Sequence, residues 1–399
     1  MIRKMTSPKF FFRLLFLVSF GLVSTGCKKK EYKPEESFIK VYNDDDGSRN
    51  YFPLSMQQTS DEGYLILSAY NGWNIHLLKT DKEGDMLWEY DLPSKYINAV
   101  PTLMKRNTGL YFVCMDAVGL HTYVMQVDET SRSAVEFQEF QQLKYPLYVA
   151  DNSSVVYIQN YERSSYKTGI TKLNAAMDQI EEFGSVNIFT DVEDKIVDHL
   201  SYTGKRFPFH VSVTPENDYV VMSGFNNYSF STVFLDSDLD FSGVYNGAAF
   251  DGGLNSILPL GGNKFALARF SFSNLYYNPS ATLSPTAIDI AESIQAEGKA
   301  ELDAESPVLI KNIAIEGTEY TTYLATTKSN QLLLNFYQKG SNVLKGTKYL
   351  GQSAPLKACD FAKTTDEGLM IAARVTLMSS FNRIATIKLS KEELAAIVE

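Results

Sequence analysis

Histidines are the first candidates for acid–base or metal chemistry, and the chain has four of them: His76, His121, His199 and His210. No two stand at i, i+4 or in a His-x-His arrangement, the spacings at which a zinc site on one element takes its ligands. The chain also contains no Gly-x-Ser-x-Gly segment and no cysteine beside a histidine, so no nucleophile is marked. The sequence therefore predicts no catalytic residue, no metal site and no cofactor.

His76 and His121 leave one alternative open, because they fall at similar positions in successive segments of the chain. Two such residues could face one site. Side chains alternate between the faces of a strand, so such histidines more often lie between packed sheets or at the surface. We accordingly expect a protein without catalysis, and we keep as the alternative a glycan-active enzyme, a lyase or hydrolase, that would use these histidines or surface carboxylates.

Three segments join aromatic and amide side chains: 70–73 (YNGW), 225–228 (FNNY) and 272–277 (FSNLYY). Each follows an apolar run and precedes the next one, so all three are expected at turns on one rim of the fold. Aromatic faces beside amides suit sugar rings or peptide segments. The candidate ligand-binding residues are Tyr70, Trp73, Asn226, Tyr228, Asn274, Tyr276 and Tyr277. The alternative is that they are turn residues with partly exposed rings.

Two acidic segments invite comparison with calcium loops. If Gly47 of Asn43–Gly47 is placed at the sixth position of an EF-hand loop, Tyr42 and Pro53 occupy the first and twelfth positions, where acids are needed. Asp236–Asp240 has alternating acids, but Phe241 follows where the loop requires glycine. We interpret the first segment as a solvated turn and the second as a hairpin turn.

The elements that would position these residues begin with a repeated motif. Thr59–Gly63 (TSDEG) is a turn followed by predicted strands at Tyr64–Tyr70, Ile75–Thr80 and Met86–Tyr90. Residues 364–371 repeat 59–66 closely, and Ile384–Leu389 then takes the place of the second strand. A motif found at both ends of a chain indicates a repeat architecture.

Between the two ends, apolar strands recur after polar turns. They start near Tyr64, Leu110, Val155, Tyr219, Phe265, Thr321 and Leu369. A spacing near 45 residues with about four strands is typical of a β-propeller blade. We therefore predict an all-β fold, a single β-propeller over residues 38–399 with about seven four-stranded blades, six or eight remaining open.

Phe38–Tyr42 (FIKVY) has no blade of its own, and it is predicted to complete the last blade and cover its edge. Two long intervals mark insertions at 183–208 and 276–307. Residues 285–304 within the second have helix-forming composition, with Ile288, Ala291 and Ile294 at helical spacing. The sequence thus predicts a short helical insertion there. Loops added to a rigid scaffold often carry function.

The N-terminal residues have the pattern of an export signal. Residues 1–26 hold four basic and no acidic side chains around an apolar stretch, 10–23, that is short for a membrane span. The stretch ends in Leu22-Val23-Ser24-Thr25-Gly26-Cys27, which resembles the lipobox of bacterial lipoproteins. This resemblance implies a signal peptide over 1–26, lipidation at Cys27, a tether over 27–37 and an outer-membrane location, with the leaflet undecided.

The formal net charge is −10 at pH 7, so the chain repels phosphate backbones and nucleic acid is an unsuitable partner. Cys114 and Cys359 fall in separate repeats and are not expected to pair with each other.

Residues 80–89 (TDKEGDMLWE) resemble the Asp-x-x-Gly-x-x-x-Trp signature of quinoprotein-like and WD-like propeller repeats, here Asp81, Gly84 and Trp88. The resemblance implies a tryptophan packed between blades, and it implies no quinone cofactor, since this fold hosts many functions. We expect a membrane-anchored, non-catalytic binding or scaffold subunit of the cell envelope. Its partner would be a glycan or a protein such as an outer-membrane β-barrel or transporter. A purely structural envelope protein is the remaining alternative.

Overall fold

The computed structural model describes residues 36–42, 48–106, 109–152, 154–202, 205–351, 354–378 and 380–399. The chain divides into two compact units, 1–34 and 35–399. The signal peptide, Cys27, most of the tether and Asn43–Gly47 lie outside the described residues. Among those described, no helix has the length and apolar character needed to cross a bilayer.

The described part of the chain is nearly all β, and most neighbouring strands pair antiparallel. The last sheet joins the two ends of the 35–399 unit. Its strands pair in the order β1, β30, β29, β28, with bounds β1 (Phe38–Tyr42), β28 (Leu356–Lys363), β29 (Leu369–Leu377) and β30 (Phe381–Leu389). The predicted pairing of Phe38–Tyr42 with the last strands is confirmed, with Phe38 opposite Lys388.

The largest sheet has nine strands and contains two groups of four joined by a two-residue strand, β6 (Tyr96–Ile97), which pairs with both β4 and β8. The first group is β2 (Tyr51–Gln58), β3 (Tyr64–Tyr70), β4 (Asn74–Thr80) and β5 (Met86–Asp91). The second is β7 (Leu103–Arg106), β8 (Gly109–Asp116), β9 (His121–Asp128) and β10 (Ser133–Lys144). The three strands predicted between residues 64 and 90 are all present.

Four further sheets follow. The first consists of β11 (Pro146–Asp151), β12 (Val156–Glu162), β13 (Lys167–Leu173) and β14 (Ile180–Asn187). The second consists of β15 (His210–Val213), β16 (Tyr219–Asn226), β17 (Ser229–Asp236), β18 (Phe241–Asn246) and β22 (Ile288–Ile290). The third consists of β19 (Gly252–Gly261), β20 (Lys264–Ser271), β21 (Asn274–Thr282) and β23 (Glu297–Gly298), and the fourth of β24 (Leu309–Ile315), β25 (Thr318–Thr326), β26 (Leu332–Gln338) and β27 (Leu344–Leu350).

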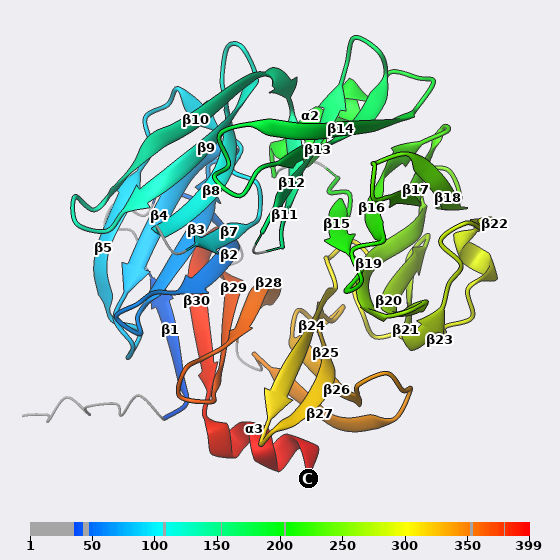
Figure 1. Ribbon diagram of the computed structural model, residues 1–399. Helices are drawn as coiled ribbons and strands as arrows, with labels where there is room; N and C mark the ends of the chain where they lie inside the picture. Colours follow the sequence, from blue (N-terminus) through cyan, green and yellow to red (C-terminus); the bar gives the residue numbers. More distant parts are fainter. Residues whose placement is uncertain are drawn as a thin grey trace, which may run out of the picture. The chain divides into compact units, whose positions relative to one another are not determined.

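Pairing gives six sheets among the described residues; when the nine-stranded sheet is divided at β6, the strands other than β6 and β22 form seven sets of four. Set 1 is β2–β5, set 2 is β7–β10, set 3 is β11–β14, set 4 is β15–β18, set 5 is β19–β21 with β23, set 6 is β24–β27, and set 7 is β28–β30 with β1. The first strands of most neighbouring sets contact each other, including β28 of set 7 and β2 of set 1 (Figure 1). Between sets 2 and 3, β11 contacts β8, and Arg106 of β7 pairs with Asp151 of β11 at 2.7 Å. The carboxylate of Asp360 links three of them, because it accepts from Ser55 Oγ at 3.0 Å and from Lys311 Nζ at 2.7 Å.

The prediction of a helix within 285–304 is wrong. The segment holds the short strands β22 and β23 and one three-residue 3-10 turn, η1 (Ala291–Ser293). β22 extends along β18 in a parallel pairing, while Ala291 and Ile294 are buried against set 5. The apolar residues of this segment are thus buried without forming a helix, because pairing at a sheet edge overrides helix propensity.

Two α-helices occur in the described residues. α2 (Glu193–Leu200) lies in the other insertion, where no helix was predicted. α3 (Lys391–Val398) ends the chain, and the Ser390 hydroxyl caps it by accepting from the N–H of Glu393 at 3.2 Å.

Candidate functional site

One end of the sets carries the turns that join second and third strands, and backbone hydrogen bonds between these turns and neighbouring connections recur there. The N–H of Asn98 donates to Trp73 O (2.9 Å), that of Tyr228 to Ile188 O (3.1 Å) and that of Phe272 to Asp251 O (2.6 Å). Each bond ties such a turn to a chain connection between consecutive sets. We call this end the hairpin end. The three segments predicted to bind a ligand all contribute turns to it.

Each of these turns exposes one aromatic side chain. Trp73 is 51% exposed, Tyr228 57% and Phe272 69%, and Asn274 is exposed as well. Single exposed apolar side chains are common on protein surfaces, so this exposure shows that the rings can be reached from solvent. Three of the predicted residues, Trp73, Tyr228 and Asn274, are therefore available to a ligand.

Other predicted residues are less accessible. Tyr70 and Tyr276 are half-buried, and each ring lies under a guanidinium, that of Arg49 at 5.0 Å and that of Arg269 at 4.3 Å. A ligand could reach only the edges of these rings. Both arginines could still contribute hydrogen-bond donors beside the ring that they cover.

Asn226 and Tyr277 lie inside the fold, with exposures of 9% and 1%. The ring of Tyr277 stacks on that of Tyr323 with centroids 4.4 Å apart, in the core between sets 5 and 6. Successive side chains of β21 point to opposite faces, so Tyr276 and Tyr277 cannot serve the same surface. Burial raises the pKa of Tyr277 well above its ordinary value.

The residue that sequence reasoning missed is Phe189, directly after β14. Its ring stacks on Tyr228 with centroids 5.9 Å apart and an interplanar angle of 25°, and both rings are more than half exposed. Both residues have positive φ, 65° for Phe189 and 63° for Tyr228. Bulky residues rarely adopt this backbone region, and such outliers gather at functional sites. Its place at the start of an insertion was the available signal.

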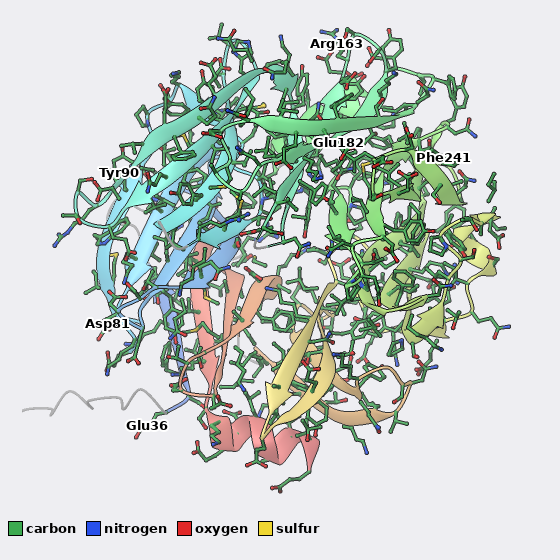
Figure 2. The ribbon with its side chains drawn as sticks, viewed as in Figure 1. Glu36, Asp81, Tyr90, Arg163, Glu182 and Phe241 are labelled. Atoms are coloured by element: carbon green, nitrogen blue, oxygen red, sulfur yellow. The ribbon has the colours of Figure 1, made fainter. Side chains whose placement is uncertain are left out.

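The α2 segment (residues 188–202 and 205–209) leaves set 3 at this end. Glu193 at the start of α2 pairs with Arg163 of set 3 at 2.8 Å, and Figure 2 shows Arg163 at the outer edge of the molecule. The hydroxyl of Tyr161 donates to Asp191 at 2.9 Å. Burial and the bond to Asp191 raise the pKa of Tyr161 above its ordinary range.

The same segment reaches sets far from its own in the sequence. Tyr202 donates its hydroxyl to Ala99 O at 3.0 Å, and its ring lies 6.0 Å from that of Phe52 in β2. Lys205 pairs with Asp251 at 2.7 Å, just before β19. The α2 segment therefore spans from set 3 to β2 of set 1 and to the connections that precede β7 and β19 at the hairpin end.

The histidines do not assemble into a site. His76 is 2% exposed, and its Nδ1 lies 2.8 Å from Asp91 Oδ1. The Nδ1 of His121 lies 3.0 Å from Glu139 Oε1, and the two rings have no carboxylate partner in common. His199 and His210 are held neutral by burial, which lowers the pKa of His210 to about 4.

Cys114 and Cys359 are both free, so the expectation that they do not pair is confirmed. Burial raises the pKa of the Cys359 thiol to about 11 and that of Cys114 further still. Thiols with such pKa values are poor nucleophiles at neutral pH. Among the described residues, no group of three or more His, Cys, Asp or Glu side chains could hold a metal ion.

Comparison with known proteins adds little. No family model matches the chain, and no curated protein matches it. Among solved structures, hydrazine synthase of Kuenenia stuttgartiensis resembles it with a TM-score of 0.49 and 10% identity, over 82% of this chain and 96% of that one.

A functionally unknown protein of Desulfotomaculum acetoxidans gives a TM-score of 0.44 and 10% identity, over 75% of this chain and 89% of that one. A protein of unknown function from Bacteroides caccae gives 0.30 and 10%, over 48% of this chain and 66% of that one. Likenesses at this level establish neither a family nor an activity for this chain.

Proposed function

We propose that this chain is an outer-membrane lipoprotein anchored through Cys27, and that residues 38–399 form a seven-bladed β-propeller. The propeller is supported by the seven strand sets, by the contacts between their first strands, and by β1 as the outer strand of set 7. The anchor is supported by the sequence Leu22–Cys27 and the basic, apolar stretch before it. Its role is that of a non-catalytic binding or scaffold subunit of the cell envelope.

The observation that carries the binding role is the set of exposed rings at the hairpin end, namely Trp73, Phe189, Tyr228 and Phe272. Phe189 and Tyr228 stack on each other, whereas Trp73 and Phe272 lie on turns of other sets, and Asn274 near Phe272 is exposed as well. Flat aromatic faces on several turns, with exposed amide groups near them, suit a carbohydrate chain, whose rings stack on aromatic side chains. We therefore favour a glycan as the ligand of this end.

The test is glycan-array binding of the full-length protein in detergent, compared with the triple variant W73A/Y228A/F272A. We expect wild-type binding to at least one polysaccharide and its loss in the triple variant. Because the three rings are exposed, each substitution should change the free energy of unfolding by no more than about 0.5 kcal/mol.

The matched control is F241A. Phe241 is 50% exposed at the start of β18, on the turn between third and fourth strands and hence away from the hairpin end (Figure 2). This variant should bind like the wild type. Equal binding by the triple variant and the wild type would contradict the assignment of the hairpin end.

The protein partner is tested by crosslinking and affinity purification of the lipidated chain from its own envelope. Stoichiometric recovery of an outer-membrane β-barrel or transporter would identify the protein as a subunit of that assembly. Turnover of a polysaccharide by the purified protein would overturn the non-catalytic role and favour the glycan-active enzyme.

A further inference from the structure

Two arginine side chains lie where the α2 segment meets β2 and β29. The guanidinium carbon of Arg206 lies 3.9 Å from the ring centroid of Tyr202, and that of Arg374 lies 5.2 Å from the ring centroid of Phe52. The two rings are themselves neighbours at 6.0 Å. Two cations and two aromatic rings from three separate parts of the chain therefore form one cluster.

Neither guanidinium forms an ion pair with a carboxylate of the described residues. This separates them from Arg49, Arg106 and Arg163, which pair with Asp91, Asp151 and Glu193 at 2.7–2.8 Å. The Nε of Arg374 is moreover buried and has no hydrogen-bond partner. A buried donor and two uncompensated charges are unfavourable in a folded protein unless something pairs with them.

The electrostatics of the cluster agree with this geometry. Burial lowers the pKa of Arg374 below its ordinary value, and the nearby positive charge of Arg206 lowers it further, with only the Cys359 thiol opposing. Arg206 also opposes the ionisation of His199, whose pKa is lowered first by burial. The chain as a whole carries a formal charge of −10, yet this cluster contains no acid. The local charge thus calls for an anion from outside the described residues.

We propose that Arg206 and Arg374 bind the oxyanion group of a small ligand, a carboxylate, phosphate or sulfate. The rings of Tyr202 and Phe52 act as supports, because a guanidinium stacked on an aromatic face keeps its N–H edge free for bidentate hydrogen bonds. Tyr202 itself is not a donor to the ligand, since its hydroxyl already donates to Ala99 O. The site does not depend on the glycan proposal, although an acidic sugar would satisfy both.

The experiment measures the thermal unfolding midpoint and calorimetric binding of the full-length protein in detergent. The probes are sodium phosphate, sulfate and glucuronate, with glucose as the neutral probe and sodium chloride holding the ionic strength constant. We expect at least one oxyanion to raise the midpoint in a concentration-dependent way, and glucose to have no effect. A preference for phosphate or for glucuronate distinguishes a phosphorylated from a carboxylated ligand.

The variants R206M and R374M keep aliphatic bulk and remove one charge each. Each should weaken oxyanion binding by about tenfold or more, since each removes a charge-assisted bidentate contact. The matched control R163M removes an arginine that already has a carboxylate partner, and it should bind like the wild type. Should R374M fail to fold, R206M carries the test.

A second readout separates binding from a structural role. Without added oxyanion and at low salt, R206M should unfold at the same temperature as the wild type or higher, because it relieves repulsion between like charges. A merely structural arginine would give a lower midpoint. The proposal is overturned if no oxyanion raises the wild-type midpoint, or if R206M and R374M bind the oxyanion as tightly as R163M.

Discussion

The turn before β3 and the turn before β29 have nearly the same sequence, TSDEG and TTDEG, and nearly the same structure. Thr59 N–H donates to Gly63 O at 2.9 Å, and Thr364 N–H donates to Gly368 O at 3.0 Å. Glu62 and Glu367 have the same φ, 65°. A five-residue sequence thus gives the same turn at both places, because the backbone hydrogen bond that closes the turn lies within those five residues.

Each turn also holds a buried lysine from the third strand of its set. Lys79 Nζ lies 2.7 Å from Asp61, and Lys388 Nζ pairs with Asp366. The lysine side chains are 2% and 1% exposed. The aspartates differ, at 53% for Asp61 and 22% for Asp366. The motif therefore specifies the pair, while the surrounding chain specifies how far the pair is removed from water.

The hairpin end differs from both turns. Its connections share no sequence motif, and its exposed rings and the two unpaired arginines are supplied by different sets. The first-to-second-strand turns satisfy their own polar groups, whereas the hairpin end leaves apolar surface and positive charge available. The contrast is thus between turns whose polar groups are paired within the fold and turns that leave aromatic side chains exposed.

The largest expected effect is that of a methyl group in the first turn. An added Cβ at Gly63 would lie 2.2 Å from Thr80 O, a backbone atom that cannot move aside. We expect G63A to lower the free energy of unfolding by about 3 kcal/mol or more, by overpacking. Gly317 provides the control, because φ there is +79° but nothing lies within 4 Å. G317A should cost only the backbone strain of about 1 kcal/mol. Equal losses in urea unfolding would contradict this.

The next effect compares the two carboxylates. D366A leaves Lys388 buried and without its acid, and we expect a loss of about 3 kcal/mol. D61A should cost clearly less, because Asp61 is half exposed and Lys79 keeps its 3.0 Å bond to Thr80 O. Denaturant unfolding at pH 7 measures both. If D61A is as destabilising as D366A, then burial of the pair by the surrounding chain does not change how much the pair stabilises the fold.

The smallest effect is the response to acid. Burial by itself would raise the pKa of Asp61 and of Asp366, but hydrogen bonds from Lys79 and Lys388 and from the turn outweigh it and hold both pKa values below the ordinary range. A lowered carboxyl pKa contributes stability that is present above the unfolded value, about 4, and is lost as the pH falls through the folded value.

Stability should therefore decrease as the pH falls below about 4. The variant D366N should flatten this part of the profile more than D61N does. The measurement is urea unfolding at pH values from 5 downwards. Identical slopes in the wild type and both variants would show that the two pairs do not contribute.

Strand positions were largely predictable because the signals are local. The run Tyr64–Tyr70 is the strand β3 without change of bounds, and Phe38–Tyr42 is β1, paired with β30 as predicted. The prediction of a helix within 285–304 was wrong, because the apolar residues of this segment pack against the core of set 5 and its chain pairs with the edge strand β18. The sequence of the segment does not by itself indicate that β18 and the core of set 5 lie beside it.

The candidate site divides in the same way. Trp73, Tyr228 and Asn274 lie at turns that could be predicted from the glycine, asparagine and serine residues beside them. Tyr277 was predicted with them but is buried, because alternation along β21 and the presence of Tyr323 decide its side. Phe189 joins Tyr228 only through the path of the chain after β14.

The sequence by itself determined the strands, the repeated turns, the joining of both ends and the turns that display aromatic residues, since each depends on residues within a few positions or on a repeat. Only the tertiary structure brought Arg206 to Arg374, and Tyr202 to Phe52. These residues are far apart in the chain, and no local hydrogen bond or periodicity encodes that they belong to one cluster. They meet because the α2 segment crosses the hairpin end, and that path is set by packing against several sets at once.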